Sequence, residues 1–274
     1  MTKEDLIRYR EVCRKRVYND EEFSPEDFEK DIYYPIIGDF NNNKHLKLYR
    51  YSSLNDNNID AFDRDIIYLA NNDSLNDLFE GLPSEVSNQT SVDRHLEYYK
   101  ELFYSKSFSE VYDNPIMWGL YADSHTGFCV GYDLSLLEKE NEALRHIYPV
   151  VYDEKRAEDY TLRQDYSDIT GKAKEKLEKD ILLPLMLLKD RKWENELEWR
   201  VAKAFSPNEK VERELPFDCV TEVYLGARTP KFKRKIIENL VREKSNRCNR
   251  EINLFIMKPN LCKFELKSEK YECN

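Results

Sequence analysis

The chain has 274 residues, a length that allows one large domain or two small ones with a sizeable core. Hydrophobic residues make up 41% and aromatic residues 13%, which excludes a disordered protein, while the 35% of charged residues indicates a very polar surface. The net charge of −10 argues against non-specific binding to DNA or anionic membranes, but a local basic patch remains compatible with a nucleic-acid contact.

Cysteine, histidine and hydropathy patterns point to a cytoplasmic protein with reduced thiols. The six cysteines include no C-x-x-C pair, which fits neither a disulfide scaffold nor a zinc site. None of the four histidines stands at metal-ligand spacing, so we expect no metal. The longest apolar run, residues 181–188, contains Pro184 and is too short to span a membrane, and the N-terminus lacks the apolar core of a signal peptide.

The N-terminal region is expected to be a helical extension. Apolar residues recur at helical spacing over about 3–18, and Ser24-Pro25 is typical of the start of a second helix. The asparagine run 41–43 predicts a loop. We therefore expect two domains, a helical extension over 1–43 and a main domain over 44–274.

Strand and helix patterns interleave irregularly in the main domain. Period-two patterns and short apolar runs predict strands at 46–51, 66–70, 105–109, 127–133, 145–152, 192–203, 219–225, 252–257 and 263–266. Helical spacing and capping residues predict helices that begin near Asn57, Val92, Pro115, Lys172 and Pro230. Because many of the strands are adjacent in sequence, we expect the α+β class.

The segment 192–203, KWENELEWRVAK, is the most informative part of the chain. As a strand it would place Glu194, Glu196 and Glu198 on one face and apolar residues on the other. Three carboxylates on one strand face repel one another, so a purely structural strand rarely has this pattern. Two interpretations remain open: a carboxylate held against a ribose, or a solvent-exposed acidic edge with Trp199 in the core.

Four segments together resemble a known family. They are LYRY (48–51), NDLF (76–79), SFSE (107–110) followed by MWGLYADSHTGFCV (117–130), and WENELEWR (193–200). Their order and spacing resemble the bacterial family catalogued as domain of unknown function 2971, over roughly residues 46–225. The chain departs from that family at Leu78, where many members carry proline, and its helical N-terminus lies outside the resemblance. The family name itself implies no activity.

Three short motifs also resemble the ADP-ribosyltransferase fold, whose members cleave NAD at the nicotinamide glycosidic bond. Arg50 would stand on an early strand, and Ser107 or Ser109 on a middle strand. The pair Glu196 and Glu198 would stand on a late strand, which completes the Arg–Ser–Glu order of that fold. The resemblance implies a mixed, mostly antiparallel sheet as the core and NAD as a substrate, with no metal.

Glycosidic cleavage explains why such residues would be needed. The ribose becomes positively charged in the transition state, and a fixed carboxylate, here Glu198, stabilises that charge. Glu196 would activate an acceptor or a water, and Arg50 would give the pyrophosphate a bidentate donor. Ser107 or Ser109 would orient Glu198. The plain alternatives are a strand-edge salt bridge for Arg50 and polar surface for the two serines.

Aromatic residues within the motifs could form a platform for nicotinamide, since a base stacks on an aromatic face. The candidates are Tyr49, Tyr51, Trp118 and Tyr121. Plain core packing is the alternative for Trp118. His125, close to Asp123, fits either an acid–base pair or a loop residue that precedes the following strand.

The first hypothesis is an NAD-consuming enzyme, an ADP-ribosyltransferase or an NAD glycohydrolase, acting as a bacterial toxin or defence effector. Its acceptor would be a protein, a nucleic acid, a small molecule or water, and no membrane is involved. The alternative is a non-catalytic nucleotide-binding or protein-interaction module whose acidic face contacts a basic partner. A magnesium nuclease ranks last because no second carboxylate cluster of suitable spacing is present.

Overall fold

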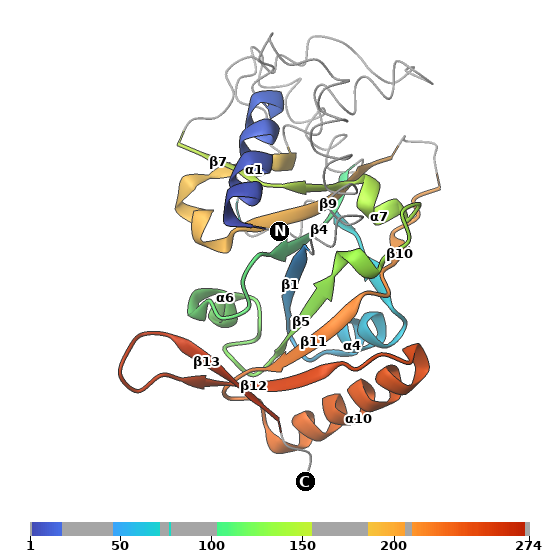
Figure 1. Ribbon diagram of the computed structural model, residues 1–274, viewed down its shortest axis with the longest axis vertical. Coiled ribbons are helices and arrows are strands. Elements are labelled where there is room, and N and C mark those ends of the chain that lie inside the picture. The colour runs from blue at the N-terminus through green and yellow to red at the C-terminus, as the bar shows by residue number, and fades with distance from the viewer. Residues whose placement is uncertain are drawn as a thin grey trace, which may run out of the picture. The chain divides into compact units, whose positions relative to one another are not determined.

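The computed structural model describes residues 2–17, 46–71, 77, 103–154, 186–205 and 210–271 (Figure 1). The predicted helices from Ser24 and Val92, the loop at 41–43 and nearly all of the helix from Lys172 lie outside these residues. Each helix within the described ranges is too short or too polar to cross a membrane.

Helices and strands both contribute substantially to the described chain. The helices are α1 (Lys3–Val17), α4 (Asp56–Asp63), α6 (Pro115–Leu120), α7 (Glu142–Arg145) and α10 (Lys231–Cys248), with 3-10 helices η3 (Leu134–Leu136) and η5 (Arg191–Glu196). The strands are β1 (Lys47–Ser52), β2 (Ile66–Tyr68), β3 (Ala70–Asn71), β4 (Phe103–Ser109), β5 (Phe128–Asp133), β6 (Ile147–Pro149), β7 (Val151–Asp153), β8 (Leu188–Asp190), β9 (Glu198–Ala204), β10 (Glu214–Pro216), β11 (Val220–Leu225), β12 (Asn253–Pro259) and β13 (Leu266–Lys270). Most of the strand pairs are antiparallel, so the expected α+β class with a mixed, mostly antiparallel sheet is confirmed.

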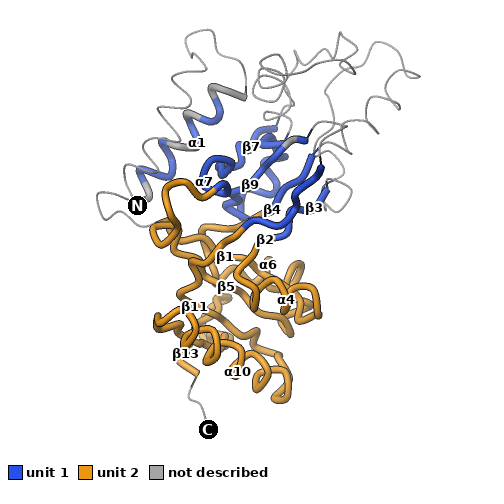
Figure 2. Tube along the Cα trace, turned by 90° about the vertical axis from the view of Figure 1, so that its right-hand side faces the viewer, with its two compact units in different colours: residues 1–42, 68–106, 142–215 blue, residues 43–67, 107–141, 216–274 orange. Residues whose placement is uncertain are grey.

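The chain divides into two units, each assembled from separate stretches of sequence (Figure 2). Unit 1 comprises residues 1–42, 68–106 and 142–215, and unit 2 comprises residues 43–67, 107–141 and 216–274. These two units differ from the two predicted domains, a helical extension over 1–43 and a main domain over 44–274, and that domain division stays a prediction.

Unit 2 contains a ladder in the order β13-β12-β11-β5-β1, continued by the end of β4. β5 is antiparallel to both β1 and β11, whereas β11 and β12 are parallel. Buried side chains from these strands pack against α6, where the ring of Tyr51 meets Trp118 edge-on at a centroid distance of 5.3 Å. α6 begins as its sequence predicts, with the Asn114 side chain accepting from the Met117 and Ile116 backbone N–H groups and Pro115 in its first turn.

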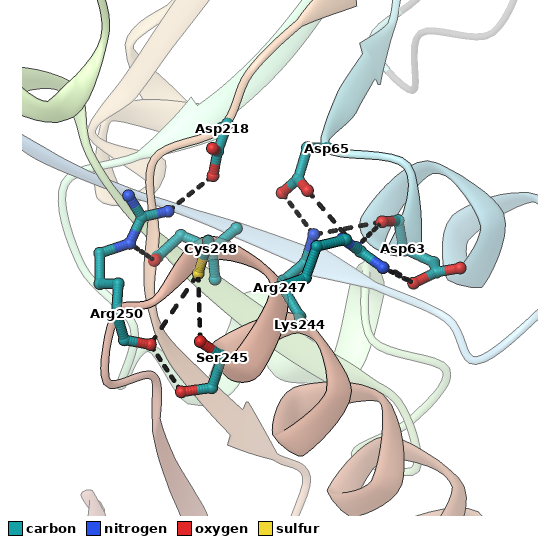
Figure 3. Close-up of polar contacts among 9 residues, drawn as sticks. Asp63, Asp65, Asp218, Lys244, Ser245, Arg247, Cys248 and Arg250 are labelled. Carbon is teal, nitrogen blue, oxygen red and sulfur yellow. Dashed lines mark hydrogen bonds and ion pairs between the residues drawn. The ribbon is translucent and has the colours of Figure 1, made fainter.

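Ion pairs attach the C-terminal half of α10 to the end of α4 and to the turn before β2 (Figure 3). The side chain of Lys244 is fully buried and donates to the Asp65 carboxylate and, at 3.4 Å, to the Asp63 carbonyl. Arg247 donates to the same two aspartates. Asp65 has φ = 56°, a left-handed conformation that aspartate tolerates better than most residues. The turn therefore supplies the negative charge that a buried lysine requires.

Unit 1 contains the order β4-β9-β6, with β3 beside β4, and a separate parallel pair of β7 and β8. α1 packs beside β6 and β7. The expected single strand 145–152 is wrong, because α7 ends at Arg145 and Val150 separates β6 from β7. The expected strand 263–266 is also misplaced, since β13 begins at Leu266.

Candidate functional site

A buried charge cluster in unit 1 contains both glutamates of the E-x-E motif. It consists of Lys189 on β8, Glu196 at the end of η5, and Glu198 and Arg200 on β9. Lys189 Nζ donates to Glu196 Oε2 at 2.7 Å and to Glu198 Oε2 at 2.9 Å. Arg200 donates from Nε to Glu198 Oε1 at 2.7 Å and from Nη2 to Glu198 Oε2 at 2.9 Å.

These four side chains are almost completely withdrawn from solvent. Their exposed fractions are 6% for Lys189, 9% for Glu196, 5% for Glu198 and 2% for Arg200. Charges removed from water are tolerated only when they are paired and hydrogen-bonded, and here two cations face two carboxylates. Arg200 also donates from Nη1 to the Met186 carbonyl at 2.6 Å. The cluster is therefore locally neutral and well bonded.

The backbone before β9 explains how Glu196 and Glu198 both reach Lys189. The expected strand over 192–203 is wrong in its first half, because residues 191–196 form η5, capped by the Asp190 side chain accepting from Lys192 N. Leu197 then adopts a left-handed conformation with φ = 45° before β9 begins. Glu194 consequently does not share a strand face with the other glutamates: its side chain is 56% exposed and lies 3.7 Å from Arg191.

The main chain of Glu198 is held as firmly as its side chain. Its N–H donates to Tyr152 Oη at 2.7 Å, and its carbonyl accepts from Val150 N at 2.9 Å and from Arg10 Nη1 at 3.2 Å. Arg10, on α1, also donates to the Val150 carbonyl at 2.5 Å. Burial, followed by the negative charge of Glu198, raises the pKa of Tyr152, so the phenol stays protonated. Every polar atom of Glu198 thus has a partner.

This arrangement fixes a carboxylate but also covers it. Preorganisation is what electrostatic stabilisation of a ribosyl cation requires. However, both Glu198 oxygens are bound by Arg200 or Lys189, so a substrate could reach them only after Lys189 moves and the cluster opens. The same contacts would serve equally well as a purely structural ion cluster.

Unit 2 holds the arginine and serines predicted for the site. Arg50, on β1, is half-buried and donates from Nη1 to the Ser107 carbonyl on β4 at 2.7 Å. Ser109 is buried, and its Oγ accepts from Val111 N at 3.1 Å in the turn that follows β4. The structure therefore brings Arg50 and Ser107 together. Glu198 belongs to the other unit, so its convergence with Arg50 on one cleft stays a prediction.

The aromatic candidates occupy different environments within unit 2. Trp118 has no exposed surface and donates from Nε1 to the Tyr112 carbonyl at 2.7 Å, as a core residue would. Tyr51 is buried against it and donates to the Val111 carbonyl at 2.9 Å. Tyr49 and Tyr121 are half-buried and pack at the margin of the same core. Only these last two retain appreciable accessible surface.

His125 lies in a turn with unusual backbone geometry. Asp123, Ser124 and His125 have φ values of 49°, 53° and 70°, all left-handed. The Asp123 carboxylate accepts from Thr126 Oγ1 at 2.8 Å. Burial and then the charge of Arg228 lower the pKa of His125, which favours the neutral imidazole.

Close backbone packing explains two glycines around this turn. A Cβ at Gly127 would lie 2.2 Å from the Ser52 carbonyl oxygen, and one at Gly226 would lie 2.2 Å from that of His125. Thr229 Oγ1 also donates to the Gly127 carbonyl at 3.0 Å. The D-S-H-T-G motif, residues 123–127, therefore has a clear packing role, because its last residue must be a glycine for the backbones to approach this closely.

Sequence reasoning missed Lys189, Arg200, Tyr152 and Arg10 as parts of the site. A usable signal was the position of Arg200, a single cation between apolar residues in a strand pattern close to the glutamates, whereas Lys189 begins the charged run 189–192 and does not stand out. Nothing local pointed to Arg10, which is separated from Glu198 by 188 positions. Within the described ranges, no group of three or more His, Cys, Asp or Glu side chains is placed to hold a metal ion.

Comparisons with known proteins identify one related family. The family described as "Protein of unknown function (DUF2971)" matches residues 117–201, a range that includes the D-S-H-T-G turn and the E-x-E motif. This match is shorter than the range 46–225 inferred from the sequence. No curated protein and no solved structure matches the chain. The resemblance stated from the sequence is therefore confirmed over residues 117–201.

Proposed function

We propose that this chain is an NAD-consuming enzyme, an ADP-ribosyltransferase or an NAD glycohydrolase with a fold of the ADP-ribosyltransferase-like type. The observation that carries the proposal is Glu198, a carboxylate with every polar atom fixed and with Glu196 bound to the same lysine. NAD is the substrate, and a cytoplasmic bacterial toxin or defence effector is the setting that suits such an activity.

Glu198 acts on the reacting sugar in this proposal. Loss of nicotinamide leaves positive charge on the ribose, and a preorganised carboxylate stabilises that charge without reorganising in the transition state. Arg200 keeps hold of Glu198 while Lys189 withdraws from it. Release of Lys189 also frees Glu196 to accept a proton from a water or an acceptor hydroxyl. The closed cluster is thus the resting form of the site.

Arg50 binds the pyrophosphate in this proposal. Its guanidinium is planar and carries several N–H donors, which match two phosphate oxygens in a way that a lysine ammonium cannot. The contact with the Ser107 carbonyl restrains the side chain, which supports its role as a positioned anion ligand.

The decisive experiment measures free nicotinamide after incubation of the full chain with NAD. Glu198→Gln keeps the shape of the side chain but removes its charge, and we expect turnover to fall on the order of 100- to 1,000-fold. The KM for NAD should change much less, because the carboxylate acts mainly in the transition state. Glu194→Gln is the matched control, since that side chain is exposed and outside the cluster, and it should retain activity.

Two results would contradict the proposal: wild-type protein that releases no nicotinamide, or Glu198→Gln protein that is folded and as active as wild type. Glu196→Gln separates the two possible reactions. Loss of transfer with retention of NAD hydrolysis would identify an enzyme that modifies an acceptor.

A non-catalytic nucleotide-binding or protein-interaction module is the second candidate. The complete pairing and the burial of Glu198 favour the absence of catalysis, because a cluster of this kind stabilises a fold without any reaction, although a buried Glu198 cannot contact a basic partner. Under this alternative, Glu198→Gln lowers the melting temperature and no nicotinamide appears with any variant. The melting curve of each variant is therefore recorded alongside its activity.

A further inference from the structure

β13 is the terminal strand of the ladder in unit 2. Of the described strands, only β12 pairs with it, through the antiparallel register Met257↔Ser268. Its opposite edge presents backbone donors and acceptors that another strand can use. The loop between β12 and β13 comprises residues 260–265 (Figure 1). It carries the two most exposed large apolar side chains of the described chain: Leu261 is 95% exposed and Phe264 is 107% exposed.

We propose that β13 pairs antiparallel with β13 of a second copy of this chain, about a two-fold axis at Ser268. In that register, residues whose numbers add up to 536 face each other, because both members of a pair lie equally far from residue 268. Lys267 then faces the partner's Glu269, and Glu269 faces the partner's Lys267. Opposite charges at directly facing positions stabilise an antiparallel pair, and the two-fold axis makes this pairing occur twice.

The neighbouring registers are electrostatically worse. A two-fold axis perpendicular to the sheet keeps each side chain on its own face of the sheet. Directly facing residues of an antiparallel pair also share a face, so the axis must lie at a residue and can move only from one residue to the next. An axis at Lys267 would set the two copies of Lys267 opposite each other, and an axis at Glu269 would do the same for the glutamates. Like charges in these positions are destabilising. The charge pattern of β13 therefore selects Ser268.

The hairpin itself has a charge imbalance that the second copy corrects. Lys258 on β12 faces Lys267 directly, an unfavourable cross-strand pair, and Glu269 forms its ion pair with Lys258 diagonally. The partner's Glu269 would add a carboxylate beside Lys267. Lysines on an exposed edge usually prevent pairing of strands. In this register, however, Lys267 of each copy meets the partner's Glu269, so this lysine favours one specific partner.

The other face of β13 and the tip of the hairpin fit the same arrangement. Leu266 is half-buried against the core of unit 2 and would face the aliphatic stem of the partner's Lys270. Glu265 would face the partner's Tyr271, so the exposed loop with Phe264 lies next to the end of the partner's strand. β13 has five residues, and a strand pair of this length buries less than the roughly 1,200 Å² of a stable interface. We therefore expect a dimer that dissociates on dilution.

The test measures the mass of the full chain in solution over a concentration series, by sedimentation or light scattering. Lys267→Glu and Glu269→Lys should each weaken the wild-type dimer about 10- to 100-fold, because each replaces two attractions with two repulsions. A mixture of the two variants should form a heterodimer, since every facing pair is then of opposite charge. The double variant, which exchanges the two charges within one chain, should restore self-association.

Lys231→Glu is the matched control, because it makes the same charge change at an exposed position of α10 in the same unit and should leave the dimer intact. The melting temperature of each variant shows whether it is folded. Wild-type protein that stays monomeric at the highest soluble concentration overturns the proposal. So does a dimer that is insensitive to Lys267→Glu, or a variant mixture that remains monomeric while each variant is folded.

Discussion

At the scale of single residues, the E-x-E motif shows how an acidic pattern can be neutralised inside a protein. One lysine, Lys189, binds a carboxylate oxygen of both Glu196 and Glu198, and Arg200 binds both oxygens of Glu198. The motif is therefore not the solvent-exposed acidic edge that the sequence permitted, and the other interpretation, a carboxylate held against a ribose, stays a prediction. Any function of Glu198 depends on the strength of these ion pairs.

Lys189→Met tests how much the fold depends on this cation. The substitution keeps an unbranched chain but leaves two buried carboxylates without their shared partner, and removing one member of a buried pair typically costs about 3–5 kcal/mol. We expect a loss of that order in the free energy of unfolding, measured by urea denaturation at pH 7.

Lys192→Met is the control for this measurement. Its side chain is 87% exposed and its ion pair with Asp190, at 3.4 Å, is open to solvent and therefore weak. The change in the free energy of unfolding should stay within about 0.5 kcal/mol. Equal stabilities of the Lys189 and Lys192 variants would show that the ion pairs of Lys189 contribute little to the free energy of unfolding, and that the cluster can open at little cost in free energy.

The residue-level prediction from sequence was partial for a physical reason. Glu196 and Glu198 stood out because their spacing is local, and Arg50 and Ser107 are neighbours as their strands require. The partners of Glu198 were not foreseeable in the same way. Tyr152 and Arg10 reach it from positions 46 and 188 residues away in the sequence, and such contacts exist only once the strands have assembled.

At the scale of elements, local signals succeeded where capping residues were present. α6 and α4 begin close to the predicted Pro115 and Asn57, after Asn114 and Asn55, whose side chains accept from the first turn. The strand prediction for residues 191–196 was wrong because a two-residue period over so few residues also fits a short turn. The chain ends this turn at Leu197, which has a left-handed backbone conformation, and a leucine in the sequence does not indicate such a conformation.

The contact between α1 and β9 gives an element-level prediction. Arg10 joins the helix to the carbonyls of Val150 and Glu198, and Arg14 adds an ion pair to Asp153. Arg10→Ala removes the first link, so we expect a loss of about 1–2 kcal/mol in stability. Amide hydrogen exchange should also become faster in peptides covering 147–153 and 198–204.

Glu11→Ala is the control, because Glu11 is exposed on the same helix. Unchanged exchange in both strands of the Arg10 variant would mean that α1 does not restrain the start of β9. Faster exchange together with a lower turnover and a constant KM would make Arg10 a positioning residue for the proposed reaction.

At the scale of the whole molecule, the two units are each built from three separate stretches of chain. Composition and loop signals along a sequence detect boundaries between consecutive segments, so they could not indicate units that interleave. The class of the fold was predictable because it depends on the order of helices and strands. The grouping of those elements was not, because it depends on which strands pair over long distances.

Ligand linkage provides the last prediction, because a ligand that binds only the folded chain stabilises all of it. At an NAD concentration 100 times its dissociation constant, the stabilisation is about 2.7 kcal/mol, which corresponds to a rise of roughly 5–10 °C in melting temperature for a chain of this size. Arg50→Lys should reduce this rise, since lysine cannot bind a pyrophosphate in a bidentate manner, whereas Glu198→Gln should largely preserve it. A rise without release of nicotinamide would favour the nucleotide-binding module over the enzyme. No rise at millimolar NAD would contradict both, and a protein-interaction role would then be the explanation to pursue.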